Sequence, residues 1–123
     1  MSRFKQQGFS NTFKNARKGF RLVFKSEMNI RVHLIIAILV LIFAYLLNFS
    51  VLEYDTILFA IAIVIISEML NTAIEFTLDS IYHNRYSKMV GMAKDISAGA
   101  VLFATFISII IGVILFGSKF ITF

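Results

Sequence analysis

Three long apolar segments restrict the folds that this chain of 123 residues can adopt. They cover residues 32–49, 56–78 and 96–116. Each approaches the roughly 20 residues that a helix needs to cross a hydrocarbon core of about 30 Å. The composition is 59% hydrophobic and only 15% charged, which is typical of an integral membrane protein. We therefore predict a single all-α membrane domain over residues 1–123 with three transmembrane helices.

Basic residues are concentrated on one side of the predicted spans. Eight of the twelve Lys and Arg residues precede the first span and three lie between the second and third, whereas the first link carries Glu53, Asp55 and no base. Cytoplasmic loops of membrane proteins carry an excess of Lys and Arg. The N-terminus and second loop are therefore predicted to be cytoplasmic, and the C-terminus outside, in a multi-pass protein.

Residues 1–31 precede the first span and include an amphipathic pattern. Phe9, Phe13 and Phe20 recur at helical spacing, while the opposite side is basic and includes Arg17. This pattern predicts a surface helix on the inner leaflet, where basic side chains attract anionic lipid. We expect a membrane partner and no nucleic acid.

Polar side chains interrupt the second apolar segment. They follow one another in steps of three, four and four, at Glu68, Asn71, Glu75 and Asp79. These steps place the four side chains on one face of a helix. Carboxylates at membrane depth are expensive and mark functional sites by default. In the predicted orientation Glu75 and Asp79 lie near the cytoplasmic end, and Glu68 lies deeper.

Acidic and basic residues outside this span are predicted at a similar depth. Glu27, between the surface helix and the first span, could join Glu75 or form a salt bridge with Arg31, and the sequence favours neither. Lys94 and Asp95 alone would be an interfacial base beside a helix-capping acid. Their predicted depth instead indicates that carboxylates and one ammonium converge at the cytoplasmic rim.

The third span carries small residues at four-residue steps, at Ala100, Ala104, Ser108 and Gly112. Small residues in register let helices approach closely, so this face is predicted to pack against another helix. Three helices would scarcely enclose a polar stripe alone, which favours a homo-oligomer. His33, near the start of the first span, is predicted to be an interfacial or hydrogen-bonded histidine rather than a metal ligand.

Carboxylates with a nearby lysine suit phosphoryl transfer. Mg²⁺ prefers carboxylate oxygens together with substrate phosphates, and a lysine can hold phosphate as a point charge. Glu68 could then act as a base on a lipid hydroxyl. A different interpretation is a small transporter in which Glu68 and Glu75 relay protons or bind an ion, without need of Lys94 and Asp95. A third is a structural module whose stripe only joins helices.

The segment Glu68-Met-Leu-Asn-Thr-Ala-Ile-Glu75, followed by Asp79 and Ala93-Lys94-Asp95, resembles the signature of the prokaryotic diacylglycerol kinase family. The resemblance extends over nearly the whole chain. It implies a homotrimeric kinase of the bacterial plasma membrane that uses MgATP to phosphorylate a lipid alcohol. Each active site would be shared between neighbouring protomers.

Residue roles follow from the same resemblance. Glu27 and Glu75 would hold Mg²⁺, Glu68 would be the general base, and Asn71 would position Glu68 or the substrate. The ATP site would be lined by Arg17, Asp79, Lys94 and Asp95. Asn29 with His33, and the absence of tryptophan, resemble the Gram-positive branch, which prefers undecaprenol to diacylglycerol.

Overall fold

The computed structural model describes residues 8–83 and 87–121, and all regular structure within them is helical. The helices are α2 (Phe9–Ser26), α3 (Met28–Leu46), α4 (Val51–Tyr82) and α5 (Lys88–Ile121). The last three are long and apolar enough to cross a membrane, which confirms the predicted number of spans. Arg3, Lys5 and Arg85, which contribute to the charge asymmetry, lie outside the described residues.

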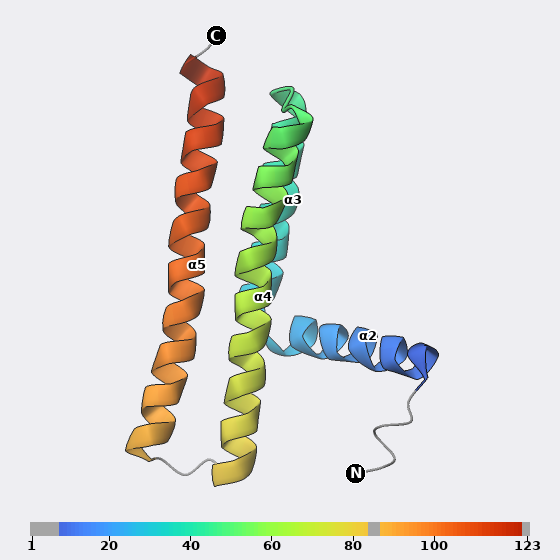
Figure 1. Ribbon diagram of the computed structural model, residues 1–123, viewed down its shortest axis with the longest axis vertical. Helices are drawn as coiled ribbons and strands as arrows, with labels where there is room; N and C mark the ends of the chain where they lie inside the picture. Colours follow the sequence, from blue (N-terminus) through green and yellow to red (C-terminus); the bar gives the residue numbers. More distant parts are fainter. Residues whose placement is uncertain (1–7, 84–86, 122–123) are drawn as a thin grey trace.

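Helices α3, α4 and α5 lie along the long axis of the molecule, and α2 crosses this direction (Figure 1). The main helix packing is between α4 and α5, with α3 against α4 and α2 against α3. Both α4 and α5 continue past the level of α2 (Figure 1). If α2 lies on the membrane surface, the end of α4 and the start of α5 both extend beyond that surface, away from the membrane core.

Glu27 forms the corner between α2 and α3. Its backbone is extended, with φ −117° and ψ 113°, and its N–H caps α2 by donating to the Val23 carbonyl. One extended residue is enough to turn the chain from the crosswise helix into the first span. Val23 is the buried residue of α2, whereas Phe9 is 87% exposed within the chain. The aromatic face of α2 is thus free to contact lipid.

The turn from α3 to α4 is built on Asn48, which adopts a left-handed backbone with φ 56°. Phe49, predicted inside the first span, instead lies in this turn and packs against the ring of Phe116 at 5.0 Å between centroids. Lys119 contributes an ion pair of 2.9 Å to Glu53. The C-terminal end of α5 therefore packs against the turn between the first two spans.

A capping box begins α4. The Ser50 side chain accepts a hydrogen bond from the Glu53 N–H at 3.2 Å, and the Glu53 side chain accepts one from the Ser50 N–H at 2.9 Å. Loss of a capping hydroxyl typically costs about 1 kcal/mol. We expect Ser50→Ala to lower the free energy of unfolding by about that amount, measured by detergent-induced unfolding, and Ser50→Thr to retain most of it. Equal stability of the Ala variant would show that the cap contributes nothing.

Small residues let α5 approach α4 closely. Ala104 is buried, and the Ser108 hydroxyl of α5 donates a hydrogen bond of 2.8 Å to the Ala60 carbonyl oxygen of α4. The predicted packing of this face against another helix is confirmed at these two positions. Ala100 is exposed in the single chain.

The helices extend beyond the expected span limits. Helix α4 has 32 residues and α5 has 34, compared with the roughly 20 that the hydrocarbon core requires. At 1.5 Å per residue, each is roughly 50 Å long. The additional turns carry the polar end of α4 and the start of α5 to the level of α2 and past it.

Candidate functional site

The polar row of α4 faces its helical neighbours. Glu68 and Thr72 are buried, at 6% and 5% exposure. Asn71, Glu75 and Asp79 are partly buried. Because the residues lie three or four positions apart on one continuous helix, they form a row rather than a point cluster. Contacts from α3 and α5 then divide this row into a deep part, at Glu68, and a shallow part, which includes Glu75 and Asp79.

Glu68 forms the deep part of the row. Its Oε1 atom lies 2.8 Å from Nδ1 of His33, which comes from α3. The distance suits an ion pair, although the contact lacks the alignment of a directed hydrogen bond. Its Oε2 atom is buried and has no hydrogen-bond partner among the described residues. A buried acceptor left unsatisfied is costly, so this oxygen is a candidate acceptor for a ligand's proton.

Asn71 connects α4 with α5. Its Nδ2 donates to Oε1 of Glu75 at 3.0 Å, and its Oδ1 accepts from the Ser97 hydroxyl at 2.6 Å. A carboxylate can only accept and a hydroxyl can donate, so the two partners fix the orientation of the amide. In the structure the hydrogen bonds of Asn71 therefore position Glu75, the shallower carboxylate, while Glu68 contacts His33.

The shallow part of the row ends at an ion pair between the helices. The Lys94 Nζ on α5 lies 2.7 Å from the Asp79 Oδ1 on α4, with 37% and 38% of the two side chains exposed. The prediction that Lys94 reaches the depth of Asp79 is confirmed by this contact. Asp95 and Arg17 are exposed, and within the described part of the chain neither contacts another predicted site residue.

Glu27 lies beside the deep part of the row. It is partly buried and lines a polar cavity of about 370 Å³ together with Glu68 and Asn71. Within residues 8–83 and 87–121 it forms no ion pair with Arg31, which is exposed. The corner between α2 and α3 therefore directs an acidic residue to the cavity, which agrees with a role in the site.

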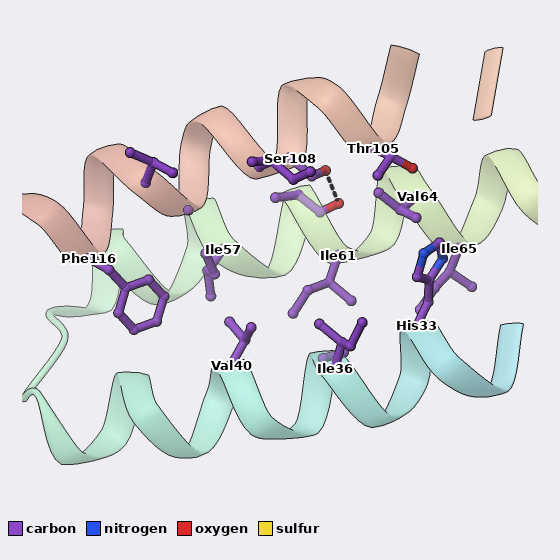
Figure 2. Close-up of a pocket in the computed structure, with 15 residues that line it drawn as sticks. His33, Ile36, Val40, Ile57, Ile61, Val64, Ile65, Thr105, Ser108 and Phe116 are labelled. Atoms are coloured by element: carbon purple, nitrogen blue, oxygen red, sulfur yellow. Dashed lines mark hydrogen bonds between the residues drawn. The ribbon is translucent and has the colours of Figure 1, made fainter. Parts of the chain in front are cut away.

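A second, apolar cavity of about 420 Å³ lies between α3, α4 and α5. Figure 2 shows it extending from Phe116 at one end to His33 and Thr105 at the other. His33 and Thr105 also line the polar cavity. The two cavities thus meet beside Glu68. This arrangement could hold a molecule with a hydrocarbon chain and a polar end.

The described residues contain no group of three or more His, Asp or Glu side chains that could hold a metal by themselves. Mg²⁺ commonly uses only one or two protein carboxylates and completes its shell with waters and substrate phosphates. Glu27 and Glu75 are partly buried oxygen donors: Glu27 lines the polar cavity together with Asn71, and Glu75 accepts a hydrogen bond from Asn71. Such a donor set fits a metal that arrives with a phosphate ligand.

Two residues of the site were not predicted as part of it. His33 was expected only as an interfacial or hydrogen-bonded side chain, but it contacts Glu68, and Ser97 holds Asn71. The sequence signal for His33 was a polar ring inside an apolar helix, which is expensive at membrane depth. Ser97 carried no comparable signal, since serines recur along membrane helices as packing residues.

Fold and site together define an all-helical membrane protein in which the buried Glu68 lies near an apolar cavity and a row of partly buried carboxylates ends at Lys94. The sequence model described as prokaryotic diacylglycerol kinase matches residues 14–116, and the chain belongs to that family. It is 36% identical over 111 residues to the undecaprenol kinase of Bacillus subtilis (strain 168), covering 90% of this chain and 89% of that protein.

Two diacylglycerol kinases are also similar. The enzyme of Escherichia coli (strain K12) is 31% identical over 116 residues, covering 92% of this chain and 94% of that protein. The enzyme of Synechocystis sp. is 32% identical over 101 residues, covering 82% of this chain and 58% of that longer protein. The family and these relatives support lipid kinase activity and confirm the resemblance found in the sequence.

Proposed function

We propose that this protein transfers the γ-phosphoryl group of ATP to the hydroxyl of a membrane lipid alcohol, and that the alcohol is undecaprenol. The observation that carries the proposal is the unpartnered Oε2 of Glu68, buried where a polar and an apolar cavity meet. Phosphoryl transfer needs an acceptor hydroxyl held beside a base and a charged site for the phosphates. The two parts of the polar row supply both.

Glu68 is the general base in this proposal. The lipid hydroxyl gives its proton to Oε2 of Glu68, and its oxygen forms a bond to the γ-phosphorus. The bond from the γ-phosphorus to the bridging oxygen breaks, and its electron pair leaves with ADP. Burial of Glu68 at 6% exposure keeps water from competing for the base. The apolar cavity adjoins the polar cavity that Glu68 lines, and it would hold the hydrocarbon chain of the lipid next to its hydroxyl.

The nucleotide would bind along the shallow part of the row and the adjoining polar cavity. Glu27, which lines that cavity, and Glu75, in the row, would bind Mg²⁺, which when bound neutralises phosphate charge. Asn71, anchored by Ser97, fixes Glu75 for that task. Lys94 would exchange its partner Asp79 for a phosphate oxygen, and breaking the ion pair would cost little because both side chains are over a third exposed. Arg17 and Asp95 would contact the nucleotide at its edge.

We further propose a homotrimer with shared sites, in which the N-terminus is cytoplasmic and the C-terminus outside. One observation supports sharing. Arg17 and Asp95 are exposed and form no hydrogen bond or ion pair with another site residue in the described part of one chain. Large apolar side chains of the spans, such as Phe103 and Phe106, are exposed in the single chain and would face lipid or a neighbouring protomer.

The choice of undecaprenol is supported by the similarity to the undecaprenol kinase of Bacillus subtilis. In detergent micelles with Mg²⁺ and radiolabelled ATP, purified protein should phosphorylate undecaprenol at least about tenfold faster than diacylglycerol at equal concentration; a tenfold difference corresponds to 1.36 kcal/mol of activation free energy. A preference for diacylglycerol would overturn the choice of substrate. No labelled lipid from either would contradict the kinase proposal and favour transport.

A further inference from the structure

The contact between His33 and Glu68 joins two side chains that the proposed reaction does not explain. The His33 and Glu68 side chains are 25% and 7% exposed, and 2.8 Å separates Nδ1 from Oε1. One comes from α3 and the other from α4, which pack against each other. Each would cost free energy if buried alone, because an unpaired polar group loses its hydration. The pairing therefore stabilises a carboxylate inside an apolar helix bundle.

The two oxygens of Glu68 have different surroundings. Oε1 faces His33, whereas Oε2 has no hydrogen-bond partner among the described residues. The terminal torsion of a glutamate is broad, so a free carboxylate would rotate between many orientations. Contact with one oxygen restricts that rotation and thereby fixes the direction of the other. The histidine thus determines where the free oxygen points.

His33 is also one of two residues that line both cavities. In Figure 2 it stands at the end of the apolar cavity, opposite Phe116. The hydroxyl of a lipid alcohol lying in that cavity would reach the polar cavity at this junction. A positioned base must lie within about 2.6–3.2 Å of the oxygen atom whose proton it removes. Small errors in the direction of Oε2 would therefore have large effects on the rate.

We infer that His33 is a positioning residue for Glu68: its Nδ1–H holds Oε1 and so aims Oε2 at the lipid hydroxyl. This inference rests on the proposed kinase function. The proton that leaves the lipid goes to Oε2, and His33 keeps its own proton on Nδ1 throughout. Without ligands the contact is close but too poorly aligned to count as a hydrogen bond, and catalytic groups commonly align only when the substrate is bound.

Two substitutions of similar size separate positioning from packing. Asn can place Nδ2 where His33 has Nδ1, whereas Leu removes the donor and keeps the bulk. We expect His33→Leu to lower kcat by about 10- to 100-fold with the KM for MgATP unchanged, and His33→Asn to recover most of the loss. Equal rates for wild type and His33→Leu, or equal losses in both variants, would overturn the inference.

A double mutant tests whether the effect passes through Glu68. In a Glu68→Gln background, His33→Leu should cause no further loss of kcat, because the group that it positions is already disabled. A further tenfold loss in the double mutant would show that His33 acts on something else. Both variants are compared with wild type by detergent-induced unfolding, so that a loss of fold is recognised.

A spectroscopic measurement tests the contact without activity. The chain has two histidines, and His83→Asn leaves His33 as the only one; Asn also tolerates the left-handed backbone of position 83, where φ is 51°. Nitrogen NMR of the labelled ring should show a protonated Nδ1 whose signal shifts in Glu68→Gln. A bare Nδ1 in the parent protein would overturn the inference. An inactive wild type with the expected spectrum would contradict only the proposed function.

Discussion

Replacing Glu68 by Gln is expected to lower kcat by about 10²- to 10⁴-fold while the affinity for MgATP stays within about twofold of wild type. The amide has nearly the shape of the carboxylate but cannot take a proton. Glu68 lies in the deep part of the row and contacts His33, whereas the nucleotide contacts are assigned to Glu75 and Lys94. The effect should therefore fall on the chemical step.

Single-turnover kinetics with preformed protein–MgATP complex measure that step directly. Glu53→Gln is the matched control, because Glu53 is the glutamate of α4 that lies outside the site. Gln can still serve in the capping box with Ser50, and the substitution removes only the ion pair with Lys119, away from the site. It should leave both kcat and nucleotide affinity unchanged. If Glu68→Gln abolished ATP binding and spared single-turnover chemistry, the assigned roles of the deep and shallow parts would be reversed.

Glu75→Gln is expected to raise the Kd for MgATP by at least about tenfold. Even indirect partners of a metal ligand typically change metal affinity by about 10- to 100-fold, and this substitution removes a proposed ligand's charge. The hydrogen bond from Asn71 can persist, because the oxygen of Gln also accepts. The fold should thus be retained while the affinity for the metal-bound nucleotide falls.

Equilibrium binding of a fluorescent ATP analogue, titrated with Mg²⁺, measures this change. Without Mg²⁺ the wild type and the variant should bind the analogue equally weakly. With Mg²⁺ only the wild type should gain affinity. An equal gain in both proteins would show that Glu75 does not hold the metal.

Helical periodicity was sufficient to predict the polar row. The steps from Glu68 to Asn71, Glu75 and Asp79 place the residues on one face whatever the rest of the chain does. Depth in the membrane was also sufficient to bring Lys94 to Asp79, because each residue lies near the linked ends of adjacent spans. The argument from helical spacing therefore succeeded, and the argument from depth succeeded for Lys94 but not for Asp95, which is exposed.

Pairing across helices was not predictable in the same way. The contact of His33 with Glu68 depends on the rotation and register of α3 against α4, which no pattern within either helix determines. The anchoring of Asn71 by Ser97 depends likewise on the register of α5. Helix α3 ends before Phe49 because Asn48 adopts a left-handed backbone conformation, which a hydropathy pattern does not reveal.

The sequence position of Glu27 allowed two interpretations. A salt bridge with Arg31 and a place in the site were equally compatible with its sequence position. The extended backbone at the corner between α2 and α3 directs it to the polar cavity instead. The change of helix direction thus brings Glu27 to the cavity, and its role as a metal ligand stays a prediction.

Transfer of label from γ-³²P-ATP into the organic extract of a reaction with undecaprenol tests the central claim most directly. Wild-type protein with Mg²⁺ should yield a labelled lipid monophosphate, in proportion to the amount of enzyme. The Glu68→Gln variant should yield about 10²- to 10⁴-fold less under the same conditions. Label found only as inorganic phosphate, or equal lipid labelling by both proteins, would contradict the account.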